Sequence, residues 1–206
     1  LQAAVPGLTV SDVIRDPVFH YPVSEHQSSG SRTIALNLCN RDGANTLNDE
    51  FNVFADDLAR ILAALHQEKP ISLIGVPTDP RDALFIRYVA SLVPSIPFSL
   101  QAVTSPSAYI DAVRRSDLLL GMRMHGIILG ARVAGLPVAG FLYSKKVEEL
   151  VHASGASQDF FSFGPLAVDA AVARFRQLLD QSAMPTFAAQ TQDSLRLRMF
   201  LTPLVS

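Results

Sequence analysis

Residues 118–126 read LLLGMRMHG, an apolar run that ends in glycine and is followed at once by an arginine and a histidine. A short apolar run bounded by turn residues is typical of a strand buried in a parallel sheet. We therefore predict a strand over Asp117–Gly121 and a helix over Met124–Ala134. A second strand is predicted over Leu136–Leu142, so two strand–helix units meet in this part of the chain.

The same alternation of short apolar runs and longer amphipathic ones continues on both sides. Residues 47–67 place apolar side chains three and four positions apart, the spacing of a helix with one buried face. Further strands are predicted at Thr33–Cys39, Ile71–Val76 and Phe98–Val103, and further helices at Leu47–Gln67, Asp79–Leu92, Pro106–Arg115, Val168–Gln181 and Ala188–Phe200. This order predicts an α/β domain with a mostly parallel sheet and helices on both faces.

Composition excludes several classes of protein. The 206 residues are 49% hydrophobic and 17% charged, which suits one or at most two packed domains. Lys and Arg number 17 against 19 Asp and Glu, so the basic excess that nucleic-acid binding requires is missing. The single cysteine, Cys39, cannot form an internal disulfide or a cysteine-based zinc site, and we expect a reducing compartment, the cytoplasm.

Three regions are predicted along the chain. Residues 1–31 are rich in Pro, Gly and Ser and read as a linker or the remnant of a preceding domain. Residues 32–165 form the α/β domain, and residues 166–206 form helices that close it or cross to a neighbour. The chain begins with Leu1 rather than Met, so we expect it to start inside a longer protein. Its most apolar region carries three basic residues, and no transmembrane segment is predicted.

The candidate site lies at the carboxyl ends of the strands, where open parallel sheets bind ligands. Arg123 offers a planar fork of donors that suits a carboxylate or phosphate. The imidazole of His125 changes protonation near neutral pH and can act as a general acid or base. The alternative is an arginine paired with a structural carboxylate and a histidine bonded to a neighbouring loop.

Two further strand ends carry polar candidates. Tyr143, Lys145 and Lys146 follow the strand that ends at Leu142 and can contact an anion on the same rim; the alternative is a pair of solvated lysines. Asn37 and Arg41 lie at the end of the first strand and can donate hydrogen bonds across the cleft; ordinary turn chemistry is the alternative.

The acidic residues at the next strand end are interpreted differently. Asp79 and Asp82 lie where helix capping alone places acids. Cys39 is interpreted as a small buried core residue. The histidines show no metal-ligand spacing, and no metal site is predicted.

Residues 116–131, 135–138 and 143–147 together resemble the polysaccharide pyruvyl transferase family. The family pattern of an Arg-x-His turn, a later proline, and a tyrosine three residues before a lysine is met by Arg123, His125, Pro137, Tyr143 and Lys146. Residues 16–19 resemble its Asp-Pro-x-Phe element, and residues 75–82 resemble its second strand end. The resemblance covers about residues 12–155 and is strongest over 116–150.

The resemblance implies the C-terminal, donor-binding half of a two-domain enzyme of the glycosyltransferase-B-like architecture, with a Rossmann-like sheet. Such enzymes transfer the pyruvyl group of phosphoenolpyruvate to sugar hydroxyls, forming a ketal in exopolysaccharide or cell-envelope polysaccharide synthesis. Arg123 then holds the anion and His125 donates the proton to the methylene carbon. Lys146, helped by Tyr143 and Lys145, contacts phosphate or carboxylate.

The implied partners are phosphoenolpyruvate and a saccharide acceptor that is lipid-linked or nucleotide-linked. A divalent cation bound through the donor phosphate, peripheral association with the inner face of the membrane, and oligomerisation are compatible with the sequence. Two alternative functions stay open. One is a nucleotide-sugar-dependent glycosyltransferase, although the sequence shows no clear acid placed to bind a ribose. The other is a non-catalytic sugar- or partner-binding domain.

Overall fold

A computed structural model describes residues 30, 32–40 and 49–180 of the chain. They form a six-stranded sheet in which every neighbouring pair of strands is parallel. The strands are β1 (Thr33–Asn37), β2 (Ser72–Gly75), β3 (Phe98–Leu100), β4 (Leu118–Gly121), β5 (Val138–Leu142) and β6 (Phe160–Ser162). The prediction of a parallel α/β domain is confirmed, and the arrangement is Rossmann-like.

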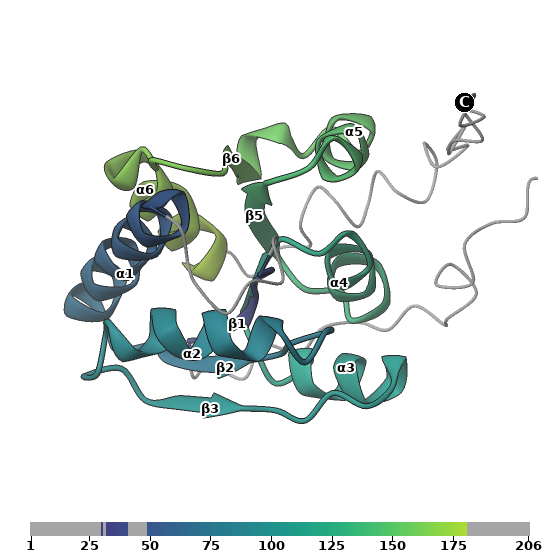
Figure 1. Cartoon of the computed structure of the whole chain (residues 1–206), viewed down its shortest axis with the longest axis horizontal. Coiled ribbons are helices and arrows are strands. Elements are labelled where there is room, and N and C mark those ends of the chain that lie inside the picture. Colours follow the sequence, from purple (N-terminus) through teal and green to yellow (C-terminus); the bar gives the residue numbers. More distant parts are fainter. Residues whose placement is uncertain (1–29, 31, 41–48, 181–206) are drawn as a thin grey trace, which may run out of the picture.

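Helices cover both faces of this sheet (Figure 1). The helices are α1 (Asp49–Glu68), α2 (Asp82–Ser91), α3 (Pro106–Val113), α4 (Met124–Ile128), which continues into a π-helical turn over Leu129–Val133, α5 (Lys145–Ala153) and α6 (Val168–Asp180), with a 3₁₀ turn at Ser157–Asp159. Helices α1, α2 and α6 pack on one face, and α3, α4 and α5 pack on the other.

The order of the strands is β3-β2-β1-β4-β5-β6. The chain runs outward from β1 to β3, then returns to place β4 on the other side of β1, with Leu36 opposite Leu120. Strand order therefore reverses between β1 and β4. In open α/β sheets this switch point leaves a crevice at the carboxyl ends of the two strands, where ligands bind.

Alternate residues of the strands point to opposite faces of the sheet and pack into two apolar layers, one on each face. Ile34 and Leu36 of β1 face the layer under α1, α2 and α6, whereas Ala35 faces the layer under α3, α4 and α5. Phe54 of α1 and Phe141 of β5 meet edge to face in the first layer, with ring centroids 4.7 Å apart. Each such ring contributes about 1.5–3 kcal/mol by burial, so these layers hold the strand ends in fixed positions.

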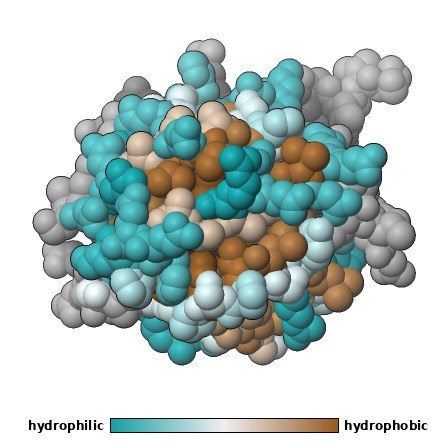
Figure 2. All heavy atoms as spheres, turned by 90° about the vertical axis from the view of Figure 1, so that its left-hand side faces the viewer, coloured by the Kyte–Doolittle hydropathy of each residue, from teal (hydrophilic) through white to brown (hydrophobic). Residues whose placement is uncertain are grey.

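The surface on the side of α1 and α6 carries both hydrophilic and hydrophobic residues (Figure 2). Among the described residues, the large apolar side chains exposed to solvent are Val53, Leu84 and Leu92. No helix within the described ranges is long and apolar enough to cross a membrane.

Several predicted boundaries shift. The strand predicted to reach Val103 ends at Leu100, and α2 begins at Asp82 rather than Asp79, because Asp79 accepts the amide of Asp82 in a turn that precedes the helix. Strand β6 was not predicted, since three residues at a sheet edge show no periodicity. The predicted linker, apart from Gly30, and the helix over 188–200 lie outside the described residues.

Candidate functional site

The candidate site forms where β1 and β4 end side by side. The amide of Met122 donates to the carbonyl of Asn37 at 2.9 Å, and the amide of Cys39 contacts Sδ of Met122 at 3.4 Å. These contacts extend the pairing of the two strands by a few residues. They bring the segment after β1 against the turn that carries Arg123 into α4.

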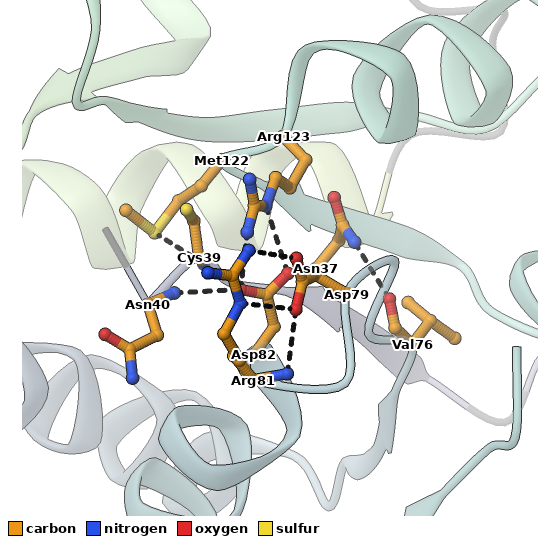
Figure 3. A network of polar contacts seen from close by, with 9 residues as sticks. All are labelled: Asn37, Cys39, Asn40, Val76, Asp79, Arg81, Asp82, Met122 and Arg123. Atoms are coloured by element: carbon orange, nitrogen blue, oxygen red, sulfur yellow. Dashed lines mark hydrogen bonds and ion pairs between the residues drawn. The ribbon is translucent and has the colours of Figure 1, made fainter. Parts of the chain in front are cut away.

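Arg123 pairs with Asp82, the first residue of α2. Its Nε donates to Oδ2 at 3.0 Å and its Nη2 to Oδ1 at 2.8 Å (Figure 3). The backbone amide of Asn40 donates a third hydrogen bond to Oδ1 of Asp82, at 3.0 Å. One carboxylate therefore connects α2 with the segments that follow β1 and β4.

The burial of Asp82 holds the Arg123 guanidinium in one position. The Asp82 side chain is 0% exposed and the Arg123 side chain is 28% exposed. Hydrogen bonding to Asp82 raises the pKa of Arg123 further above its ordinary range, so the guanidinium stays charged. The structure thus places Arg123 against a structural carboxylate, the alternative considered in the sequence, while the two hydrogen bonds do not involve Nη1.

Asp82 lies at the start of a helix, as predicted, but the prediction that it caps the helix is wrong. Its carboxylate binds a guanidinium from another strand end rather than free amides of α2. A buried acid must be paired, and only the folded arrangement shows which cation pairs with it. Sequence spacing alone carries no signal for this partner.

Asn37 lies beneath the site rather than in it. The residue is 0% exposed, and its Nδ2 donates to the carbonyl of Val76 at 2.8 Å. Its Oδ1 is buried and makes no hydrogen bond to any residue that the structure describes. A Cβ atom on Gly126 would lie 2.1 Å from this oxygen, so only glycine allows α4 to approach β1 so closely. Tyr109 adds a hydrogen bond to the Gly126 carbonyl, at 3.1 Å.

The other predicted site residues that the structure describes lie at the same edge of the sheet. His125 is exposed in the first turn of α4. Lys145 and Lys146 are exposed at the start of α5, with Nζ of Lys145 at 3.9 Å from Glu149. Tyr143 is partly buried just after β5, the neighbour of β4. Arg41 lies outside the described residues.

Cys39 and Tyr143 meet beside Arg123. Burial raises the pKa of the Cys39 thiol, an effect that the positive charge of Arg123 and a hydrogen bond with Tyr143 partly offset. Burial also raises the pKa of Tyr143. Both groups are therefore protonated at neutral pH. Cys39 is 2% exposed, which confirms its interpretation as a buried core residue.

Sequence reasoning missed Arg81. Its Nε and Nη2 donate to the two carboxylate oxygens of Asp79 at 2.9 and 2.6 Å, and its backbone amide donates to Oδ1 of Asp79 at 2.9 Å. Hydrogen bonds from Arg81 hold the pKa of Asp79 well below its usual range. A signal was present, because a cation directly before a helix opposes the helix dipole.

A hollow of about 280 Å³ lies beside this turn, between the carboxyl ends of β2 and β3. Its lining is mostly apolar and contains no lysine or arginine. The lining residues are Pro77, Thr78, Asp79, Pro80, Ala83, Leu100, Gln101, Ala102, Val103 and Thr104. The described residues contain no group of three or more His, Cys, Asp or Glu side chains placed to hold a metal ion.

No protein-family model matches this chain, and no curated protein matches it either. The fold and the site define it as a Rossmann-like α/β domain with an Arg–Asp pair, buried on its carboxylate side, at its topological switch point. Its function therefore has to be argued from the chemistry of that site.

Proposed function

We propose that this chain is the donor-binding part of an enzyme that transfers the pyruvyl group of phosphoenolpyruvate to saccharide hydroxyls. One observation carries the proposal. Arg123 lies at the switch point of the sheet, fixed by the buried Asp82 and still 28% exposed, with the exposed His125 two residues further on. A fixed guanidinium beside an accessible imidazole suits an anionic substrate that also needs a proton.

The reaction matches these two groups. Phosphoenolpyruvate carries a carboxylate and a phosphate, and Arg123 binds one of these anions through its exposed edge. A sugar hydroxyl oxygen attacks the carbon that bears the phosphate while His125 donates a proton to the methylene carbon, and the proton of that hydroxyl then replaces the one that His125 gave up. A second hydroxyl of the same sugar displaces the phosphate, which takes up the proton of this hydroxyl and leaves as inorganic phosphate, and the ketal is complete.

The neighbouring strand end supplies further positive charge. Lys145 and Lys146 start α5, directly after β5, which pairs with β4. Ammonium groups there attract a polyanionic donor to the edge of the sheet that carries Arg123. Tyr143 precedes them in the chain, lies close enough to Arg123 to be affected by its charge and keeps its proton, so its hydroxyl can donate a hydrogen bond to the donor.

The proposal extends to the rest of the enzyme. A further domain in the glycosyltransferase-B-like arrangement carries the saccharide acceptor, which is lipid-linked or nucleotide-linked. The enzyme then works in the cytoplasm, at the inner face of the membrane where the acceptor is lipid-linked. The resemblance of residues 116–150 and the chemistry of Arg123 and His125 support this arrangement of domains and this location.

A nucleotide-sugar-dependent glycosyltransferase is the second candidate. The observation that favours it is the hollow between β2 and β3, because its apolar walls and lack of cations suit a nucleobase more than a phosphate. The hollow shares Asp79 with the turn beside Arg123. The two candidates differ in the ligand that they bind.

Calorimetric titration tests the proposal, with phosphoenolpyruvate and a uridine-diphosphate sugar as parallel ligands. We expect saturable binding of phosphoenolpyruvate that is lost in Arg123→Lys, which keeps the charge but removes the planar fork. The matched control is Arg60→Lys, because Arg60 is an exposed arginine that pairs with Asp57 on α1. Preferential binding of the nucleotide sugar would establish the second candidate instead, and no binding of phosphoenolpyruvate would contradict the proposal.

A further inference from the structure

Arg81 occupies a position that helix stability does not explain. It is the residue directly before α2, and its side chain makes no capping hydrogen bond to the helix. The start of a helix carries a partial positive charge, which disfavours a cation there. A guanidinium at this position therefore needs another reason.

The ion pair of Arg81 with Asp79 is partly open to solvent. The Arg81 and Asp79 side chains are 64% and 25% exposed, so an anion in solution can approach the guanidinium although its contact with Asp79 is bidentate. Arg123 differs, since its partner Asp82 is fully buried. One guanidinium of this edge is held by a buried carboxylate, and the other reaches solvent, where an anion can compete with Asp79 for it.

The two guanidinium groups belong to one cluster. Figure 3 shows Arg81 and Arg123 beside the carboxylates of Asp79 and Asp82, which come from the same turn. Asp79 feels the positive charge of Arg123 as well as that of Arg81. Two neighbouring guanidinium groups suit a ligand with two anionic groups, because each can form a bidentate contact with one of them.

We propose that Arg81 is a second anion-binding side chain of this site, which releases Asp79 and binds the phosphate of the donor while Arg123 binds its carboxylate. This inference rests on the proposed function and specifies which residues distinguish the two ends of phosphoenolpyruvate. No covalent bond changes in the step. The Asp79 carboxylate turns to solvent when Arg81 leaves it.

Calorimetric titration with phosphoenolpyruvate and with pyruvate separates the two guanidinium groups, because pyruvate has the carboxylate but no phosphate. In Arg81→Gln we expect the affinity for phosphoenolpyruvate to fall by about tenfold to a hundredfold, the effect of losing hydrogen bonds to a charged group. The affinity for pyruvate stays the same. Arg60→Gln removes an equally exposed guanidinium from α1 and leaves both affinities unchanged.

Asp79→Asn provides a test of opposite sign. The asparagine keeps Oδ1 as acceptor for the backbone amide and Nε of Arg81, both at 2.9 Å, but loses the negative charge and the second oxygen that compete for its guanidinium. We therefore expect this variant to bind phosphoenolpyruvate severalfold more tightly than the wild type. The gain should disappear when Asp79→Asn is combined with Arg81→Gln, and a gain that persists in the double variant would show that it comes only from the removed negative charge.

The outcomes separate this inference from the proposed function. If Arg81→Gln binds phosphoenolpyruvate as the wild type does while Arg123→Lys has lost it, the donor site stands and the role of Arg81 is refuted. If the wild type binds neither phosphoenolpyruvate nor pyruvate, the proposed function is refuted together with this inference. Thermal unfolding of each variant verifies that it is folded before it is titrated.

Discussion

Arg123 donates from Nε and Nη2 to both carboxylate oxygens of Asp82, at 3.0 and 2.8 Å, although the two residues are 41 positions apart. The pair joins the end of β4 to the start of α2 across the switch point of the sheet. Because the carboxylate is fully buried and the guanidinium is not, the pair gives this edge a cation whose position is fixed and whose outer side reaches solvent.

Arg123→Met should destabilise the fold because it leaves the buried Asp82 carboxylate without its ion partner. We expect the free energy of unfolding to fall by about 3 kcal/mol, the lower end for breaking a buried pair, since the guanidinium itself is partly solvated. Chemical denaturation measures this loss.

The double variant Arg123→Met with Asp82→Asn tests whether the unpaired carboxylate causes that loss of stability. Neutralising the carboxylate removes the unpaired buried charge, so the double variant should be more stable than Arg123→Met alone. A double variant at or below the stability of the single one would show that the ion pair is not the cause.

Gly126→Ala should destabilise the contact between α4 and β1. The new Cβ would lie 2.1 Å from Oδ1 of Asn37, and this side chain is held by its hydrogen bond to Val76. We expect a loss of about 1–3 kcal/mol in unfolding free energy, the usual cost of overpacking. Differential scanning calorimetry measures it.

Asn37→Ala in the Gly126→Ala background makes room for the added methyl group. The two changes should therefore cost less together than the sum of their separate effects. Strict additivity would mean that the two residues do not restrict each other.

Stability should decline at alkaline pH in a way that depends on Cys39. Burial raises the pKa of its thiol in the folded state, so between the unfolded and folded pKa values the folded protein binds more protons. The stabilising contribution is complete below about pH 8.5, the ordinary pKa of a cysteine, and is lost as the pH rises above it. Denaturation at a series of pH values measures this slope.

Cys39→Ala removes the titrating thiol and should flatten the slope above about pH 8.5. Tyr143 also has a raised pKa and keeps its contribution, so some alkaline loss persists at higher pH. An unchanged slope in Cys39→Ala would show that the thiol titrates alike in the folded and unfolded chain.

The sequence predicted the sheet because its signal is local. The runs that end at Gly75, Gly121 and Leu142 are short, apolar and bounded by turn residues. These local features are enough to predict buried parallel strands. β6 has only three residues at the sheet edge, so its pairing with β5 depends on tertiary contacts that no local pattern carries.

The same distinction applies to the site. Arg123 and His125 could be placed at the carboxyl edge because they directly follow an apolar strand. The partnership of Arg123 with Asp82 could not be predicted, since an acid at the start of a helix is equally expected as a cap. The burial of Asn37 was also not predicted. Whether the last residue of a strand is buried depends on the helix that packs over it, and the sequence of the strand does not show this.

The most direct test of the donor site is the side-chain Nε–H signal of Arg123 in a nitrogen–proton correlation spectrum, assigned through its loss in Arg123→Lys. The bond to Asp82 should make this signal observable in the free protein. We predict that phosphoenolpyruvate shifts it saturably and that a uridine-diphosphate sugar does not. A signal that stays in place while phosphoenolpyruvate binds elsewhere, or does not bind, would contradict the account.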